Sequence, residues 1–111
     1  MNYAIIDGVE YVRKDSIELS NIVLIRTYSA GVHFGVVKYK NGGETILTSA
    51  RRLWSWSGAC SLHQVAMDGV DVANSKISVA VPEIELLETI ERIPISDKAA
   101  KVLMRAPEWK I

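Results

Sequence analysis

The chain has 111 residues, of which 49% are hydrophobic and 23% charged, so a single domain with an apolar core is expected and a disordered chain is not. Thirteen basic residues balance thirteen acidic ones, which argues against a general nucleic-acid binder, because such proteins normally carry a basic excess. One cysteine excludes an internal disulfide, and there is neither a basic-then-apolar leader nor an apolar run of about 18 residues, so a cytoplasmic protein without a membrane span is expected.

The N-terminal part predicts paired strands. Residues 3–13 divide into two β-rich halves around Asp7-Gly8, which suits a type I′ hairpin turn because both central residues need positive φ. A polar connector follows. Residues 22–27 form a nearly continuous apolar run, which predicts a strand buried on both faces or at an interface.

The next segment predicts a second hairpin. Residues 32–40 read as a strand in which Gly35 marks a bulge or a close approach of another backbone. Asn41-Gly42-Gly43 then suits the turn that leads into a strand over 44–48.

Residues 50–56 alternate in the way of another strand. Side chains two apart share a face of a strand, so Arg52, Trp54 and Trp56 are predicted on one face and Arg51 on the other. A β-bulge near Ala50 would exchange the two arginines.

A short helix is predicted over residues 61–68. Ser61 and Gln64 have the spacing of a capping box, and Gly69 suits the left-handed residue that ends a helix. Gly58 breaks the preceding strand.

The C-terminal part contains one ambiguous segment. Residues 70–76 predict a loop, and alternation over 77–81 predicts a short strand. Residues 82–93 suit either a helix or a strand, and the strand is preferred because the rest of the chain is a β meander. A last helix begins at Ser96 or Asp97 and ends before Pro107.

Together these elements predict an α+β fold, with a twisted antiparallel β-sheet, either open or curled like a small barrel, and two short α-helices. The single domain over 1–111 would comprise an N-terminal hairpin and connector over 1–20, a β-rich core over 21–95, and a C-terminal helix and tail over 96–111.

Residue groups typical of enzymes are weakly supported. Cys60 and His63 could pair as nucleophile and base, or bind zinc together with His33 and a carboxylate, but neither arrangement has the flanking motif or ligand spacing that such sites require. No catalytic residue, metal or cofactor is therefore predicted.

The arginine–tryptophan segment predicts a surface for something anionic and flat. A guanidinium fork matches phosphate, and an indole face stacks on a base with about 1–3 kcal/mol. Arg26, Tyr28 and Arg105 could add to such a site. In the alternative interpretation, the tryptophans are core or subunit-interface anchors and the arginines form surface ion pairs.

The segments YSAGVHFG, ARRLWSWSGACSLHQVAMDGV, ERIPIS and PEWK resemble a widespread family of small phage proteins of mostly unknown function, similar to the Thoeris anti-defence sponge proteins. The resemblance runs from about residue 23 to residue 110, and the N-terminal hairpin is an addition to it. It implies a homo-oligomer, a dimer or hexamer, that sequesters a cyclic ADP-ribose-type messenger made by TIR enzymes without cleaving it. Some of these proteins also bind cyclic di- or trinucleotides.

We therefore expect a phage-encoded cyclic nucleotide sponge in the cytoplasm of the infected host, not an enzyme. Arg51 and Arg52 would hold phosphates, and Trp54 or Trp56 would stack on the base. Asn74 would read a base edge, and Arg26 with Arg105 would form a second anion site between subunits. Arg52 is preferred over Arg51 because it shares a face with the tryptophans. The alternative is a phage accessory protein whose tryptophan and arginine surface binds a host protein.

Overall fold

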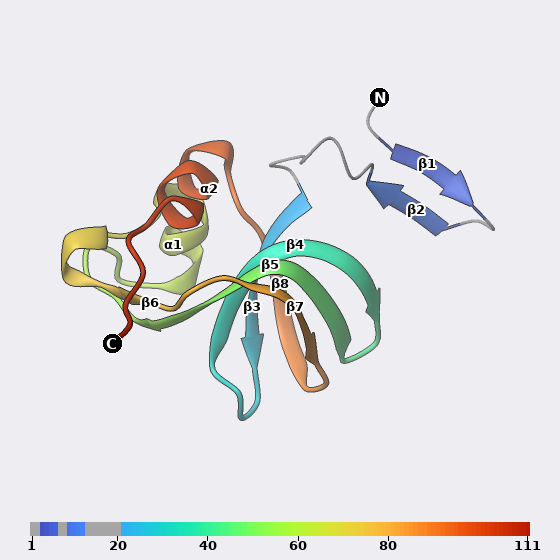
Figure 1. Ribbon diagram of the computed structural model, residues 1–111, viewed down its shortest axis with the longest axis horizontal. Coiled ribbons are helices and arrows are strands. Elements are labelled where there is room, and N and C mark those ends of the chain that lie inside the picture. Colours follow the sequence, from blue (N-terminus) through green and yellow to red (C-terminus); the bar gives the residue numbers. More distant parts are fainter. Residues whose placement is uncertain (1–2, 7–8, 13–20) are drawn as a thin grey trace.

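The computed structural model describes residues 3–6, 9–12 and 21–111 (Figure 1). Strands β1 (Tyr3–Ile6) and β2 (Val9–Val12) pair antiparallel with Ile6 opposite Val9, which confirms the predicted N-terminal hairpin. The Asp7-Gly8 turn and most of the polar connector lie outside the described residues.

The other strands form one antiparallel sheet of six strands. They are β3 (Ile22–Thr27), β4 (Val32–Asn41), β5 (Glu44–Ser55), β6 (Lys76–Ile77), β7 (Val81–Leu86) and β8 (Thr89–Pro94). The order is β6-β5-β4-β3-β8, and β7 pairs with β5 outside this path. The sheet curls, but its described strands do not close into a barrel.

Two helices, α1 (Leu62–Asp68) and α2 (Asp97–Met104), lie side by side next to one end of the curled sheet (Figure 1). A single 3₁₀ turn, η2 (Val72–Asn74), follows α1. This architecture confirms the predicted α+β fold with an antiparallel sheet and two short helices. No helix in the described part of the chain is long and apolar enough to span a membrane.

The helix ends follow the local sequence. The Ser61 hydroxyl accepts the N–H of Gln64 at 3.1 Å, and the Gln64 side chain accepts the N–H of Cys60 at 2.9 Å, which satisfies two free donors at the start of α1. Gly69 ends the helix at φ 80°. Ser96, rather than Asp97, caps α2 by accepting the N–H of Ala99.

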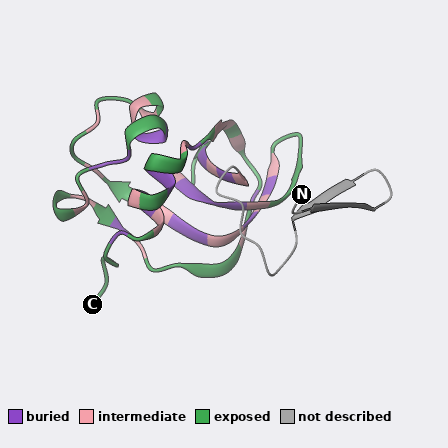
Figure 2. Ribbon diagram, turned by 90° about the horizontal axis from the view of Figure 1, so that it is seen from above, coloured by how far each residue is buried: buried purple, intermediate pink, exposed green. Residues whose placement is uncertain are grey.

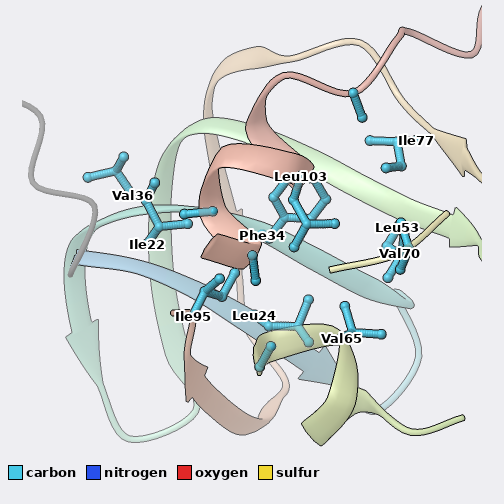
Figure 3. Packing of buried hydrophobic residues seen from close by; sticks show 14 residues of the cluster. Ile22, Leu24, Phe34, Val36, Leu53, Val65, Val70, Ile77, Ile95 and Leu103 are labelled. Carbon is cyan, nitrogen blue, oxygen red and sulfur yellow. The ribbon is translucent and has the colours of Figure 1, made fainter. Parts of the chain in front are cut away.

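The sheet separates two apolar clusters. The larger one fills the space between the sheet and both helices and contains, among others, Leu24, Phe34, Leu53, Val65 and Leu103 (Figure 3). The smaller one lies on the other face and contains Ile25, Leu47, Ala50 and Leu86. Because β3 contributes Leu24 to one cluster and Ile25 to the other, the prediction of a strand buried on both faces is confirmed. Figure 2 shows the buried positions along the strands and on the inner sides of the helices.

A β-bulge interrupts the pairing of β4 with β5. Val36 lies opposite Thr48 and Phe34 lies opposite Arg51, so Ser49 and Ala50 together face the single residue Gly35. Ser49 has a positive φ of 49°. A Cβ atom at Gly35 would lie 2.9 Å from the Thr48 carbonyl oxygen, which confirms the predicted close approach.

The bulge decides which face of the sheet each arginine occupies. Leu47, before the bulge, points into the smaller cluster. In an unbroken strand, residues 47 and 51 would share a face, but the extra residue shifts the alternation by one position. Arg51 and Leu53 therefore face the helices, whereas Arg52 faces the opposite side.

The segment after η2 differs in part from the prediction. Residues 82–93 are mostly strand, as preferred, but they belong to two strands, β7 and β8, with Leu87 and Glu88 between them. The single strand predicted over 77–81 is wrong, because β6 ends at Ile77 and β7 begins at Val81. The two strands pair with different parts of β5: Ile77 lies opposite Leu53, beyond the bulge, and Val81 lies opposite Ala50, within it.

Candidate functional site

Arg51 is buried on the helix-covered face and binds backbone carbonyls only. Its Nε donates to the Ser78 carbonyl at 2.8 Å, and its Nη1 donates to the carbonyls of Leu103 and Met104 at 3.1 and 3.4 Å. Its Nη2 donates to the Pro107 carbonyl at 3.4 Å. The guanidinium thus caps the C-terminal end of α2, where free carbonyls and the helix dipole favour a cation.

Burial lowers the pKa of the Arg51 guanidinium, and the nearby Glu108 carboxylate raises it. The side chain is only 4% exposed. With its donors directed at carbonyls inside the fold, Arg51 is a structural residue and does not present its guanidinium to a ligand on the surface.

Arg52 occupies the opposite face and stacks on Trp54. Its guanidinium carbon lies 4.3 Å from the centroid of the Trp54 ring, at cation–π distance. The side chain also lies against the turn at Gly31, where an added Cβ would come within 2.8 Å of Nη2. Arg52 and Trp54 share a face, as the alternation predicts, because both lie after the bulge. The expectation that a bulge near Ala50 would exchange the two arginines is therefore wrong.

The turn beneath Arg52 is held by its own hydrogen bonds. The Thr27 hydroxyl donates to the Gly31 carbonyl at 2.7 Å and accepts the Ala30 N–H at 2.9 Å. The Arg52 guanidinium therefore lies against a hydrogen-bonded turn and an indole ring.

His33 lies directly opposite Arg52 in the pairing of β4 with β5. Burial lowers the pKa of His33, the hydrogen bond with the Ala30 carbonyl raises it, and the charge of Arg52 lowers it. The net shift is downward, and Nε2, 2.8 Å from the Ala30 oxygen, is the donor because a carbonyl oxygen only accepts. His33 thus supports the turn through its hydrogen bond to Ala30.

The C-terminal tail brings a second indole to this surface. The rings of Trp54 and Trp109 lie 5.9 Å apart between centroids with a tilt of 33°. Lys76 places its ammonium 5.2 Å from the Trp109 centroid. Trp54 and Trp109 remain 53% and 49% exposed, so the surface is open to solvent.

The two adjacent arginines therefore have connected roles. Arg51 holds the end of α2 and the Pro107 carbonyl from the inner face, and the Trp109 N–H donates to the Ile77 carbonyl at 2.8 Å. These contacts place Trp109 next to the ring on which Arg52 stacks.

Sequence reasoning did not include Trp109 or Lys76 in the site. The signal in the sequence that could have identified Trp109 was the presence of a tryptophan in a short C-terminal tail.

The prediction that Trp56 shares a face with Arg52 and Trp54 is wrong. Trp56 is half-buried and packs against the larger apolar cluster between the sheet and the helices. The alternation ends because β5 stops at Ser55, after a shift in its register with β6. Trp56 is a core residue of the kind anticipated in the alternative interpretation.

The remaining predicted residues are bonded to other partners or exposed. Arg26 is paired with Glu91 at 2.6 Å, and Asn74 donates to Asp71 at 2.7 Å within the η2 turn. Tyr28 is 79% exposed, and Arg105 is exposed at the end of α2. The second anion site of Arg26 and Arg105 was predicted between subunits, so a single chain does not test it and it stays a prediction.

Cys60 is exposed next to the capped start of α1, and its backbone N–H donates a hydrogen bond to the Gln64 side-chain oxygen. Over residues 3–6, 9–12 and 21–111, no three histidine, cysteine, aspartate or glutamate side chains are grouped in a way that would hold a metal ion.

A family described as a domain of unknown function, DUF6948, matches residues 20–103. The chain belongs to this family. The match covers the six-stranded sheet, α1 and most of α2, and it leaves out β1, β2 and the tail with Trp109. Comparisons with curated proteins and with solved structures gave no significant match. The description of the DUF6948 family names no ligand and no activity.

Proposed function

We propose that this DUF6948 protein binds and sequesters a cyclic nucleotide second messenger of the cyclic ADP-ribose type, or a cyclic oligonucleotide, without cleaving it. The observation that carries the proposal is the stack of Arg52 on the exposed indole of Trp54. It offers a fixed cation for a phosphate and an aromatic face for a base within one small surface.

The charge balance around Arg52 supports an anionic ligand. Within residues 21–111, the Arg52 guanidinium has no carboxylate partner, whereas Arg26 is paired with Glu91. A guanidinium that is held in place but not neutralised retains its charge and its hydrogen-bond donors for a phosphate. Because the side chain is already ordered, binding costs less conformational entropy than it would for a free arginine.

Sequestration requires only tight binding and slow release. A sponge lowers the free concentration of a messenger by mass action, and no bond is broken. The resemblance of YSAGVHFG and the arginine–tryptophan segment to phage anti-defence sponges supports this role in the cytoplasm of an infected bacterium.

The second candidate is a protein-binding phage accessory factor. Trp54 and Trp109 are both about half exposed on an open surface, and tryptophan and arginine are the residues most enriched among binding hot spots. The two candidates differ in the thermal shift expected with small ligands, because only a nucleotide binder is stabilised by nucleotides alone.

We expect Arg52→Gln to weaken binding of cyclic ADP-ribose by about tenfold to a hundredfold, because a charge-assisted hydrogen bond to phosphate is lost. Trp54→Ala should cost a similar amount through lost stacking. Calorimetric titration of the folded variants measures both effects, with thermal shift against a panel of cyclic nucleotides as the first screen. Lys38→Gln is the control, since its ammonium group is already paired with Glu83. If the wild-type protein binds no cyclic nucleotide, the proposed function fails and the protein-binding candidate remains.

We also expect a homo-oligomer, a dimer or a hexamer. Large apolar side chains remain exposed on one chain, among them Leu87, Ile90, Trp109 and Ile111. Light scattering at micromolar concentration should give a multiple of the 12.3 kDa chain mass. A mass of one chain across that range would rule the expectation out.

A further inference from the structure

We infer that Lys76 and Trp109 extend the Arg52–Trp54 pair into a binding platform for a nucleotide that carries two separate phosphate groups. The inference rests on the proposed function, and it adds two residues and a ligand class to it. We call Arg52, Trp54, Trp109 and Lys76 the stacked platform.

The stacked platform has a regular order in which two cations flank two indoles. Arg52 lies 4.3 Å from the centroid of Trp54, the two indole centroids are 5.9 Å apart, and Lys76 lies 5.2 Å from the centroid of Trp109. The aromatic surface is thus in the middle and positive charge is at both ends. A ligand that matches this order has a flat base between two anionic groups.

Backbone contacts hold three separate segments of the stacked platform together. Arg52 and Trp54 belong to β5, and the Arg52 N–H donates to the Ser78 hydroxyl at 2.8 Å. Lys76 opens β6, which pairs with the end of β5. The Trp109 N–H donates to the Ile77 carbonyl, so the residues from Lys76 to Ser78 tie the tail to the strand.

The positive charge of Lys76 is available to a second phosphate. Within residues 21–111, Lys76 has no ion-pair partner, and the nearby Glu108 is paired with Lys110 at 3.4 Å. Both indoles are about half exposed and their ring centroids are 5.9 Å apart, so a base contacts the exposed parts of the two rings and does not insert between them. A nucleotide with one phosphate can use only one end of the stacked platform, whereas a nucleotide with two phosphates can use both.

The test compares adenosine, AMP and adenosine 3′,5′-bisphosphate by calorimetric titration on the full chain. We expect the bisphosphate to bind the wild-type protein about tenfold more tightly than AMP, because its second phosphate makes one additional charge-assisted contact. Lys76→Gln should remove this difference, and Lys76→Arg should restore it. Lys38→Gln is the control for a lysine outside the platform, since Lys38 is paired with Glu83.

Trp109→Ala should weaken the binding of both phosphorylated ligands about tenfold, and Trp109→Phe should retain most of it. Melting temperatures confirm that each variant is folded. If Arg52→Gln and Trp54→Ala weaken binding while Lys76→Gln and Trp109→Ala bind the bisphosphate like the wild type, the platform is wrong and the proposed function stands. If the wild-type protein binds none of the three ligands and no cyclic nucleotide, both are wrong.

Discussion

Replacing Arg51 by methionine is expected to lower the free energy of unfolding by roughly 3–5 kcal/mol. The methionine keeps much of the side-chain volume but leaves the carbonyls of Ser78, Leu103, Met104 and Pro107 without their guanidinium donor. Buried carbonyls without a partner cost far more than an exposed ion pair gains. Thermal and urea unfolding measure the loss, and we expect a fall in melting temperature of more than about 10 °C.

The matched control is Arg26→Met, which removes an exposed arginine paired with Glu91. Because its side chain is 47% exposed, its loss should cost less than about 1 kcal/mol. Arg51→Lys should fall between the two, since a lysine keeps the charge but cannot reach several carbonyls at once. If Arg51→Met and Arg26→Met lowered the free energy of unfolding equally, the hydrogen bonds of Arg51 to the end of α2 would not stabilise the fold.

Gly35→Val is the substitution with the second largest expected effect, a loss of roughly 2–3 kcal/mol. A Cβ at this position would lie 2.9 Å from the Thr48 oxygen and 3.1 Å from the Ala50 Cα atom. Both contacts are with backbone, which cannot move aside as a flexible side chain can. The strain falls on the bulge that turns Arg51 inward and Arg52 outward, so nucleotide binding should weaken together with stability.

Gly42→Ala provides the comparison for Gly35→Val. Gly42 has a φ of 57° and open space around the added Cβ, so only the backbone conformation is penalised, at about 1 kcal/mol. Urea unfolding of both variants measures the difference. A Gly35→Val protein as stable as Gly42→Ala would mean that the bulge adapts to a side chain.

Local chemistry in the sequence was sufficient for most elements. The capping pair Ser61 and Gln64 and the terminating Gly69 act within a few residues, so they specify α1 without reference to the rest of the fold. Strand alternation is also local, which is why it places Arg52 and Trp54 on one face correctly. The same rule fails for Trp56, since it holds only while the strand continues.

The candidate site depends on contacts between residues distant in sequence, and the sequence alone did not supply them. The fold class, the strands and the identity of the arginine–tryptophan segment follow from the order of residues, because turns, caps and alternation are short-range. Tertiary structure decides that Arg51 binds carbonyls near the end of the chain, that Trp109 reaches Trp54, and that Lys76 joins them. These positions follow from how β5, β6 and α2 pack, and packing depends on the register of the whole sheet rather than on any single segment.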